Sequence, residues 1–507
     1  MSFIGKLNET LNDEFNLSYT ENGALGYRTS GKELLDLNFS ISSLRSVSDY
    51  QVERAFAKAF YADKKIAIKY LFYAGDVRFG LGERRFFRIG IKFLAENEPE
   101  LALKVLSFVP EYTRWDNYLC LLETSLRSQV CEIIAKQLFK DLGNKMRNEN
   151  ISLLAKWLPS VNASSATTKK YAKIILEELH LSESKYRKVL SSLRSYLKVV
   201  EVKMSNKQWS EIDYSAVPSK ANLIYNNAFL RNDEERRREY LASLEKGETK
   251  INAGVLFPHD IVHRYKEENS WSERLKNKDA TLEELWKALP NYVEGGETTI
   301  CVADGSGSMC SKAGNGTSVT CLDVANALAI YFSERCSGEF KDKYITFSEH
   351  PQLVDLSKGE TLRDKIAIAL QHSEITNTNI KAVFDLILTT AIKFHMTQND
   401  LPKNILILSD MEFDYAADGS TDKRLFETIS QKYSEHGYKL PRLVFWNICS
   451  RTGTIPVKEN PAGVALVSGF SPSITKMVLS NSTDPYECLL EQLNSERYMP
   501  IEHVLQS

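Results

Sequence analysis

The spacing of apolar residues changes near residue 290, and this change is the strongest constraint on the fold. Before it, apolar residues recur every three or four positions, which is the period of an α-helix. After Leu289-Pro290 and Gly295-Gly296, short apolar runs alternate with helical stretches. The predicted strands are 298–303, 344–347, 405–408, 443–446 and 464–467, and the predicted helices lie near 322–336, 361–371, 379–395 and 422–435. This alternation favours a doubly wound, Rossmann-like parallel sheet.

The chain is therefore predicted to have three parts and an α + α/β fold class. Residues 1–45 are polar with scattered apolar positions, which suggests a loosely docked N-terminal arm. Residues 46–290 are predicted to form an all-α, HEAT-like helical-repeat array, although no fixed repeat period is present. Residues 291–507 are predicted to form the α/β domain.

Length and composition are those of a folded protein. The chain has 507 residues, 43% hydrophobic and 26% charged, which excludes wholesale disorder. Acidic residues near the start argue against an export signal, and the lack of long apolar runs argues against a membrane span. The eight cysteines contain no CxxC pair, so we expect reduced thiols and a cytoplasmic location.

Charge is divided unevenly along the chain. The net charge of -2 combines 45 basic and 39 acidic residues in 1–290 with 19 basic and 27 acidic residues in 291–507. The stretch 133–208 has 15 basic and 6 acidic residues, and this excess of positive charge gives the strongest electrostatic field on the chain. Such a field is either a solvated helical surface or a binding surface for a polyanion.

Oxygen-bearing side chains follow two of the predicted strands. The first strand runs into Asp304-Gly-Ser306-Gly-Ser308, and the strand 405–408 is followed by Ser409-Asp410. A threonine, Thr378 or its neighbour Thr376, precedes the helix near 379–395. Strand ends of a doubly wound sheet converge, and carboxylates with hydroxyls suit Mg²⁺ or Mn²⁺. Hydroxyl ligands leave the metal under-neutralised, so an acidic group from a partner can complete its shell.

These elements resemble the von Willebrand factor A family, whose metal-ion-dependent adhesion site uses D-x-S-x-S, a distant threonine and a later strand-end aspartate. The resemblance implies that Ser306, Ser308 and Thr378 are direct ligands. Asp304 and Asp410 would bind directly or through water. It also implies an acidic protein partner at the metal. Thr378 is preferred to Thr376 because it leads directly into an apolar helix face.

The helical half carries a second resemblance, in the segments 77–85, 110–116, 157–160 and 212–219. These are similar to an uncharacterised family that joins a helical region to a C-terminal A domain. Its layout is similar to the TROVE and Ro proteins, in which helical repeats bind structured small RNAs and misfolded RNA ends. The resemblance implies an RNA partner, structured or single-stranded. It does not identify which residues of this chain contact the RNA.

One helix of the basic stretch has a narrow apolar stripe, which is predicted to be core: Tyr186, Leu190, Leu193, Leu197 and Val200. The basic flank beside it consists of Arg187, Lys188, Arg194 and Lys198. We expect this flank to contact RNA phosphates without sequence readout, and no DNA sequence readout is expected. The cluster Arg236-Arg237-Arg238 follows three acidic residues and is predicted to be a solvated helix face.

Catalytic motifs are weak in this sequence. His259-Asp-Ile-Val-His263 resembles the metalloprotease H-E-x-x-H, but its aspartate is one methylene short, so we expect a structural or capping role. The sequence therefore favours a non-catalytic RNA-binding or ribonucleoprotein scaffold with a metal-dependent partner site. The alternatives are a protein–protein adaptor without RNA, for example a phage or stress-related assembly factor, and a metal-dependent phosphodiesterase.

Overall fold

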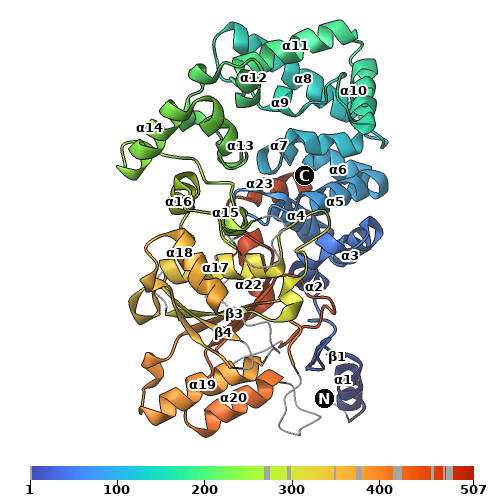
Figure 1. The fold of residues 1–507 in the computed structure, drawn as a ribbon. Helices are drawn as coiled ribbons and strands as arrows, with labels where there is room; N and C mark the ends of the chain where they lie inside the picture. Colours follow the sequence, from blue (N-terminus) through green and yellow to red (C-terminus); the bar gives the residue numbers. More distant parts are fainter. Residues whose placement is uncertain are drawn as a thin grey trace. The chain divides into compact units, whose positions relative to one another are not determined.

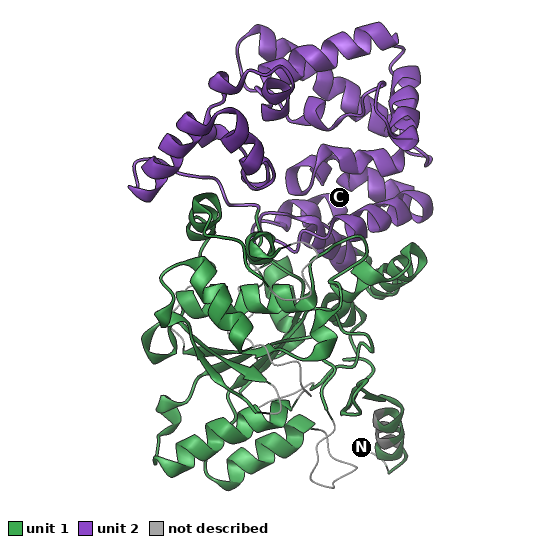
Figure 2. Cartoon of the chain, viewed as in Figure 1, with its two compact units in different colours: residues 1–64, 256–494 green, residues 65–255, 495–507 purple. Residues whose placement is uncertain are grey.

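The computed structural model describes residues 3–267, 274–293, 298–347, 350–372, 379–414, 425–457, 462–471, 474 and 483–506. The chain forms two compact units, shown in different colours in Figure 2. Unit 1 consists of residues 1–64 and 256–494, and unit 2 consists of residues 65–255 and 495–507. The chain thus passes from unit 1 to unit 2, returns to unit 1 and enters unit 2 again at its C-terminal end.

Unit 1 contains the strands of the structure and several helices. Its strands are β1 (Leu17–Tyr19), β2 (Leu25–Tyr27), β3 (Thr299–Asp304), β4 (Lys343–Phe347), β5 (Leu353–Asp355), β6 (Asn404–Ser409), β7 (Arg442–Asn447) and β8 (Val464–Ser468). Its helices are α1 (Phe3–Phe15), α2 (Glu33–Ser40), α3 (Asp49–Ala62), α15 (Pro258–Tyr265), α16 (Ala280–Lys287), α17 (Cys321–Arg335), α18 (Leu362–Gln371), α19 (Ile380–Lys393), α20 (Leu425–Glu435) and α22 (Pro485–Leu493).

A six-stranded sheet with the order β5-β4-β3-β6-β7-β8 forms the centre of unit 1. The neighbouring strands β4, β3, β6, β7 and β8 pair in parallel, whereas the edge strand β5 is antiparallel to β4. Figure 1 shows α17 and α18 on one face of the sheet and α19 and α20 on the other. The residues of β3, β6, β7 and β8 are buried throughout, which explains their continuous apolar runs. The five predicted strands are confirmed, and β5 is an addition.

The N-terminal residues are more closely packed than predicted. Helix α2 packs against β8, and Leu34, Leu35 and Phe39 are buried. The Asn38 side chain donates a hydrogen bond of 3.2 Å to the Leu466 carbonyl. Residues 33–42 are therefore part of the core of unit 1 rather than a loosely docked arm, because apolar positions of α2 complete the cover of β8.

The boundaries of the units also differ from those predicted. Residues 256–290 have the predicted helical character, but α15 and α16 pack within unit 1. The indole of Trp286 in α16, for example, donates a hydrogen bond of 2.7 Å to Glu334 in α17. The division between the compact units therefore lies at residues 255/256, since a helical pattern does not reveal which neighbour a helix covers, while the predicted domain boundary near 290 stays a prediction.

The secondary-structure elements described in unit 2 are all helices. They are α4 (Lys64–Gly75), α5 (Arg84–Asn97), α6 (Pro99–Val105), α7 (Val109–Tyr112), α8 (Arg127–Met146), α9 (Leu154–Trp157), α10 (Ala166–Glu178), α11 (Glu183–Tyr196), α12 (Val200–Ser205), α13 (Ser219–Asn232), α14 (Glu234–Glu245) and α23 (Met499–Gln506). Helix α4 begins at the last residue of unit 1. Among the described helices, none has the length and hydropathy that crossing a bilayer requires.

The residues of the predicted apolar stripe are buried or partly buried, but they belong to two helices, because α11 ends at Tyr196 and α12 begins at Val200. Tyr186, Leu190, Leu193 and Val200 are buried, and Leu197 is partly buried. Helix α11 packs against α8 and α9, and the Tyr186 hydroxyl donates a hydrogen bond of 2.9 Å to the Pro159 carbonyl. Ser182 caps the start of α11, because its side chain accepts a hydrogen bond from the Lys185 amide.

Candidate functional site

The loop after β3 brings two hydroxyl groups together. Ser306 and Ser308 lie at the carboxyl end of this strand, and their Oγ atoms are 2.9 Å apart. The Asp304 carboxylate accepts a hydrogen bond of 2.9 Å from the Ser306 amide, which fixes the turn. A short 3-10 helix, Gly307–Cys310, follows directly and holds Ser308 in place.

Strand β6 adds a second carboxylate to this loop. β6 pairs in parallel with β3, with Leu408 opposite Ala303, so their carboxyl ends lie at the same edge of the sheet. The Ser409 hydroxyl donates a hydrogen bond of 2.6 Å to Asp304. The next residue, Asp410, is in hydrogen-bond contact with the Ser308 side chain. The structure therefore brings together four of the five predicted metal ligands.

The fifth predicted ligand cannot be placed in the same way. Thr378 and its competitor Thr376 both lie outside the described residues. The described structure resumes at Asn379, whose side chain caps α19 by accepting a hydrogen bond of 3.0 Å from the Ala382 amide. The choice between the two threonines stays a prediction.

The two carboxylates are buried close together. Asp304 and Asp410 each expose 1% of their surface. Burial raises the pKa of Asp304, and the negative charge of Asp410 raises it further. Burial also raises the pKa of Asp410, while Ser308 and Arg451 act in the opposite direction. Both shifts arise first from the removal of these carboxylates from water, and for Asp304 also from the charge of Asp410.

One basic residue, Arg451, partly balances this charge, and the sequence analysis did not identify it. Its Nη1 atom lies 2.9 Å from Asp410 Oδ2, and its guanidinium also pairs with Glu21 at 2.5 Å. Arg451 lies in the loop after β7, the strand next to β6. In the sequence, the only indication of this contact is that Arg451 follows the predicted strand 443–446, which pairs with the strand that precedes Asp410.

Glu412, which had no predicted role, is the buried anchor of this loop. It exposes 1% of its surface. One carboxylate oxygen accepts hydrogen bonds from the backbone amides of Arg451 and Thr452, at 2.8 and 2.9 Å. The other accepts a hydrogen bond of 2.8 Å from the Glu21 amide. Glu412 thus holds both the Arg451 loop and the N-terminal segment beside Asp410.

The donor set of this edge fits a hard divalent cation. Two hydroxyls and two carboxylates are oxygen ligands of the kind that Mg²⁺ and Mn²⁺ bind. A site of histidine or cysteine ligands is a poorer fit, since the described residues contain no cluster of three or more His, Cys, Asp or Glu suited to a metal. The observation that favours a cation here is the pair of buried carboxylates, Asp304 and Asp410, beside two serine hydroxyls that lie 2.9 Å apart.

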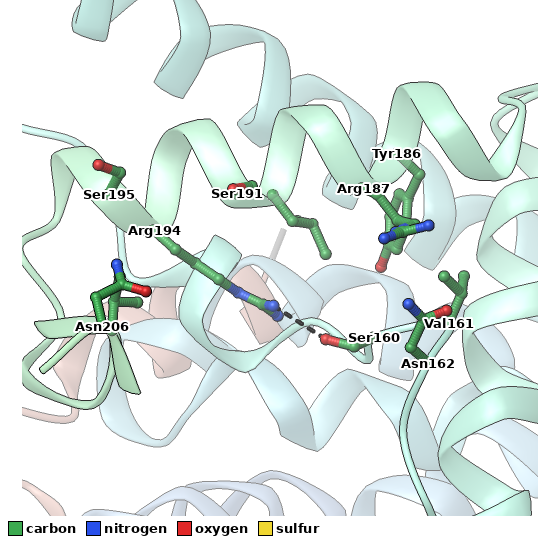
Figure 3. Close-up of a pocket in the computed structure, with 11 residues that line it drawn as sticks. Ser160, Val161, Asn162, Tyr186, Arg187, Ser191, Arg194, Ser195 and Asn206 are labelled. Atoms are coloured by element: carbon green, nitrogen blue, oxygen red, sulfur yellow. Dashed lines mark hydrogen bonds between the residues drawn. The ribbon is translucent and has the colours of Figure 1, made fainter. Parts of the chain in front are cut away.

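Unit 2 has a pocket of about 440 Å³ beside α11, which apolar side chains such as Leu190 and Val202 line together with polar ones. Figure 3 shows Arg187 and Arg194 of this helix extending toward the segment 160–162. Other polar residues that line it are Ser160, Asn162, Ser191, Ser195 and Asn206. The pocket therefore has two guanidinium groups among neutral hydrogen-bonding side chains.

The four residues of the predicted basic flank have different surroundings. Arg187, Lys188 and Lys198 are exposed. Arg194 instead turns inward and donates hydrogen bonds to the Ala155 and Leu158 carbonyls and to Ser160 Oγ, at 2.8, 2.8 and 2.9 Å. Burial lowers the pKa of its guanidinium. Arg194 therefore joins α11 to the segment 155–160, in addition to lining the pocket.

The Arg236-Arg237-Arg238 cluster is only partly the solvated face that was predicted. Arg238 is exposed and pairs with Glu234 at 2.8 Å. Arg237 is fully buried and donates hydrogen bonds to the side-chain oxygens of Asn222 and Asn226. Aromatic rings surround its guanidinium, with centroids at 5.0 to 5.4 Å: Tyr214, Phe229 and Tyr240. The prediction was wrong for Arg237 because the amide partners and two of the three aromatic rings come from outside α14.

The H-D-x-x-H segment has the structural role that was expected. Asp260 accepts a hydrogen bond of 3.0 Å from the Phe257 amide at the start of α15. His259 is buried against the ring of Phe470. The His263 ring lies 2.9 Å from Asp323, which also pairs with Lys266 at 2.5 Å. These contacts fix α15 to the start of α17.

Comparisons with known proteins place the chain among uncharacterised relatives. Residues 298–499 match the model "Domain of unknown function (DUF7788)", and residues 123–294 match "Domain of unknown function (DUF2828)". Among solved structures, the crystal structure of the Deinococcus radiodurans RO (RSR) protein is similar at 13% identity and a TM-score of 0.44, over 88% of this chain and 98% of that one.

A curated relative matches nearly the whole chain. "Uncharacterized protein L728" of Acanthamoeba polyphaga mimivirus is 30% identical over 527 aligned positions, which cover 96% of this chain and 89% of the relative. The match covers residues of both units. This chain belongs to the same protein family as mimivirus L728.

Proposed function

We propose that this protein is a non-catalytic binding protein with a metal-dependent receptor site in unit 1. Asp304, Ser306, Ser308 and Asp410 would hold Mg²⁺ or Mn²⁺ as in a von Willebrand factor A domain, with Thr378 as the expected fifth ligand. The observation that carries the proposal is the 2.9 Å approach of the two serine hydroxyls beside two buried carboxylates. The bound cation would supply an open position for a carboxylate or phosphate oxygen of a partner.

The site has the features of binding rather than catalysis. Ser306 and Ser308 provide neutral ligands, so the cation would keep positive charge with which to attract an acidic protein partner. Asp304 accepts hydrogen bonds from Ser409 and from the Ser306 amide, so it would hold the cation directly or through water while it also fixes the loop. No described His, Lys or free carboxylate in this cluster is set to activate a water molecule as a general base.

We further propose that unit 2 contributes RNA binding in a scaffold of this kind. The stretch 133–208 carries 15 basic and 6 acidic residues, and it contains the pocket that Arg187 and Arg194 line. Exposed Arg187, Lys188 and Lys198 on or next to α11 are suited to phosphate groups, whose binding releases counterions. This arrangement favours contacts with the RNA backbone over readout of bases.

Titration of Mn²⁺ into the metal-free full-length protein tests the receptor site. We expect binding to one site, which the double variant S306A/S308A loses. The variant S434A is a matched control, because Ser434 is an exposed hydroxyl on α20 of the same unit. Equal Mn²⁺ binding by all three proteins would contradict the metal site.

RNA binding is tested separately by the absorbance ratio of the purified protein, sequencing of nucleic acid that co-purifies, and titration with single-stranded RNA at several salt concentrations. The variant R187A/K188A should bind more weakly, and the control K246A/K250A, also in unit 2 but outside the basic stretch, should not. Absence of RNA binding at low salt would favour the adaptor function. Mg²⁺-dependent RNA cleavage lost in D410N would favour a phosphodiesterase.

A further inference from the structure

We propose that Arg451 is an internal cation that competes with the divalent metal for Asp410 and thereby sets the metal affinity of unit 1. The inference rests on the proposed metal site and adds a regulatory residue to it. Arg451 is outside the D-x-S-x-S loop and comes from the loop after β7, so it is not one of the predicted ligands.

The contact itself is direct. Nη1 of Arg451 lies 2.9 Å from Oδ2 of Asp410, a charge-assisted hydrogen bond. The Asp410 side chain is 1% exposed, whereas that of Arg451 is 37% exposed. The guanidinium therefore reaches the buried carboxylate from the solvent side. A carboxylate engaged in this way has less negative potential to offer a metal ion, and the arginine charge repels a second cation nearby.

The position of Arg451 is fixed by its surroundings. Glu412 accepts hydrogen bonds from the backbone amides of Arg451 and Thr452, and from the Ser450 hydroxyl at 3.1 Å. The Ser450 amide donates a hydrogen bond of 2.8 Å to the side chain of Asn447, the last residue of β7. The loop backbone is thus anchored to Glu412, which follows β6, and to Asn447 at the end of β7, which places the Arg451 guanidinium within reach of Asp410.

A second carboxylate prepares Arg451 for release. Nε of Arg451 donates to Glu21, and the Glu21 amide is held by Glu412. When a divalent cation takes Asp410, the guanidinium keeps Glu21 as its partner instead of losing both ion pairs. Glu21 therefore lowers the cost of displacing Arg451, while Arg451 raises the concentration of metal that is needed to fill the site.

This competition predicts opposite effects for two substitutions. The variant R451Q removes the competing charge, so it should bind Mn²⁺ on the order of tenfold more tightly than the wild type. This factor corresponds to a change of about 1.4 kcal/mol in the free energy of binding. The variant E21Q leaves Asp410 as the main partner of Arg451, so it should bind Mn²⁺ more weakly. The variant R451K keeps the charge and should stay close to the wild type.

The experiment is calorimetric titration of Mn²⁺ into metal-free full-length protein, with the amount of free Mn²⁺ measured independently by electron paramagnetic resonance. R363Q serves as a control, because Arg363 is a partly exposed arginine of unit 1 that donates to the Lys276 carbonyl. Thermal unfolding of each variant checks that unit 1 is folded.

The outcomes separate the two proposals. Tighter binding by R451Q, weaker binding by E21Q and unchanged binding by R363Q would support the competition. Equal or weaker binding by R451Q, or equally tight binding by R451K and R451Q, would overturn it and leave the metal site intact. Failure of every folded variant to bind Mn²⁺, R451Q included, would overturn the proposed metal site and this inference with it.

Discussion

Lys69 and Glu502 form an ion pair of 2.7 Å between residues 433 positions apart in the sequence. The Lys69 side chain is 1% exposed, and Glu502 comes from α23, the last helix of the chain. The hydrogen bond from Lys69 and its positive charge lower the pKa of Glu502. Nearby, Arg497 pairs with fully buried Asp76 at 2.9 Å. The C-terminal residues are therefore part of the structure of unit 2.

The first prediction concerns this pair. E502Q leaves the buried Lys69 ammonium without its carboxylate and should lower the free energy of unfolding of unit 2 by about 2 kcal/mol. The double variant K69M/E502Q should recover most of this loss, because methionine needs no partner when buried. Urea unfolding followed by hydrogen exchange in α4 and α23 measures both changes. Equal stability of E502Q and the wild type would show that the pair contributes nothing.

The second prediction distinguishes two adjacent arginines of α14. R237A removes two hydrogen bonds to asparagines and the packing of the side chain against three aromatic rings. We expect it to lower the stability of unit 2 by about 3 kcal/mol. R238A removes only an exposed pair with Glu234 and should change stability by less than about 0.5 kcal/mol. Thermal and urea unfolding of the two variants decide whether burial makes this difference.

The third prediction separates stability from RNA affinity on α11. R194A loses three internal hydrogen bonds of a charged donor and should destabilise unit 2 by about 2 kcal/mol. R187A should leave stability within about 0.5 kcal/mol of the wild type, because Arg187 is exposed. In RNA titrations, R187A should flatten the slope of log K against log[salt] by about 0.7 for each lost phosphate contact with a single strand. An unchanged slope would exclude Arg187 from the RNA interface.

The fourth prediction is a pH dependence of unit 1 without metal. The pKa of Asp304 is higher in the folded protein than in the unfolded chain, since burial and Asp410 disfavour its charge. Above about pH 4 the unfolded chain loses this proton, while the folded protein still holds it. The free energy of unfolding should therefore fall as the pH rises above about 4.

A divalent cation should reverse this effect. Mn²⁺ neutralises the two carboxylates, so it should raise the melting temperature of unit 1 more at about pH 7.5 than at about pH 5, where a proton partly replaces it. Differential scanning calorimetry with and without Mn²⁺ measures the two shifts. D304N removes the repulsion and should make metal-free unit 1 less sensitive to pH; the same pH dependence in D304N would exclude Asp304 as its origin.

Much of unit 1 could be predicted because its signals are local. The residues of β3, β6, β7 and β8 form continuous apolar runs that mark buried parallel strands, and Ser306, Ser308 and Asp410 directly follow two of them. Neighbouring parallel strands end at one edge, so sequence position alone predicted that these side chains would meet. The apolar stripe of α11 was local in the same sense.

Tertiary structure alone decided where the basic side chains point and which unit each terminal segment joins. Arg194 and Arg237 look like surface charges on a helical wheel, yet carbonyls of 155–158 and amides of α13 turn them inward. Arg451 meets Asp410 only because β6 and β7 are neighbours and Glu412 fixes the loop after β7. Likewise, α2 packs against β8 and α23 packs against α6, and each partner is hundreds of residues away in the sequence. Periodicity records whether a residue is apolar, but the partner that satisfies a charge or covers a helix face is set by contacts that exist only after the chain has folded.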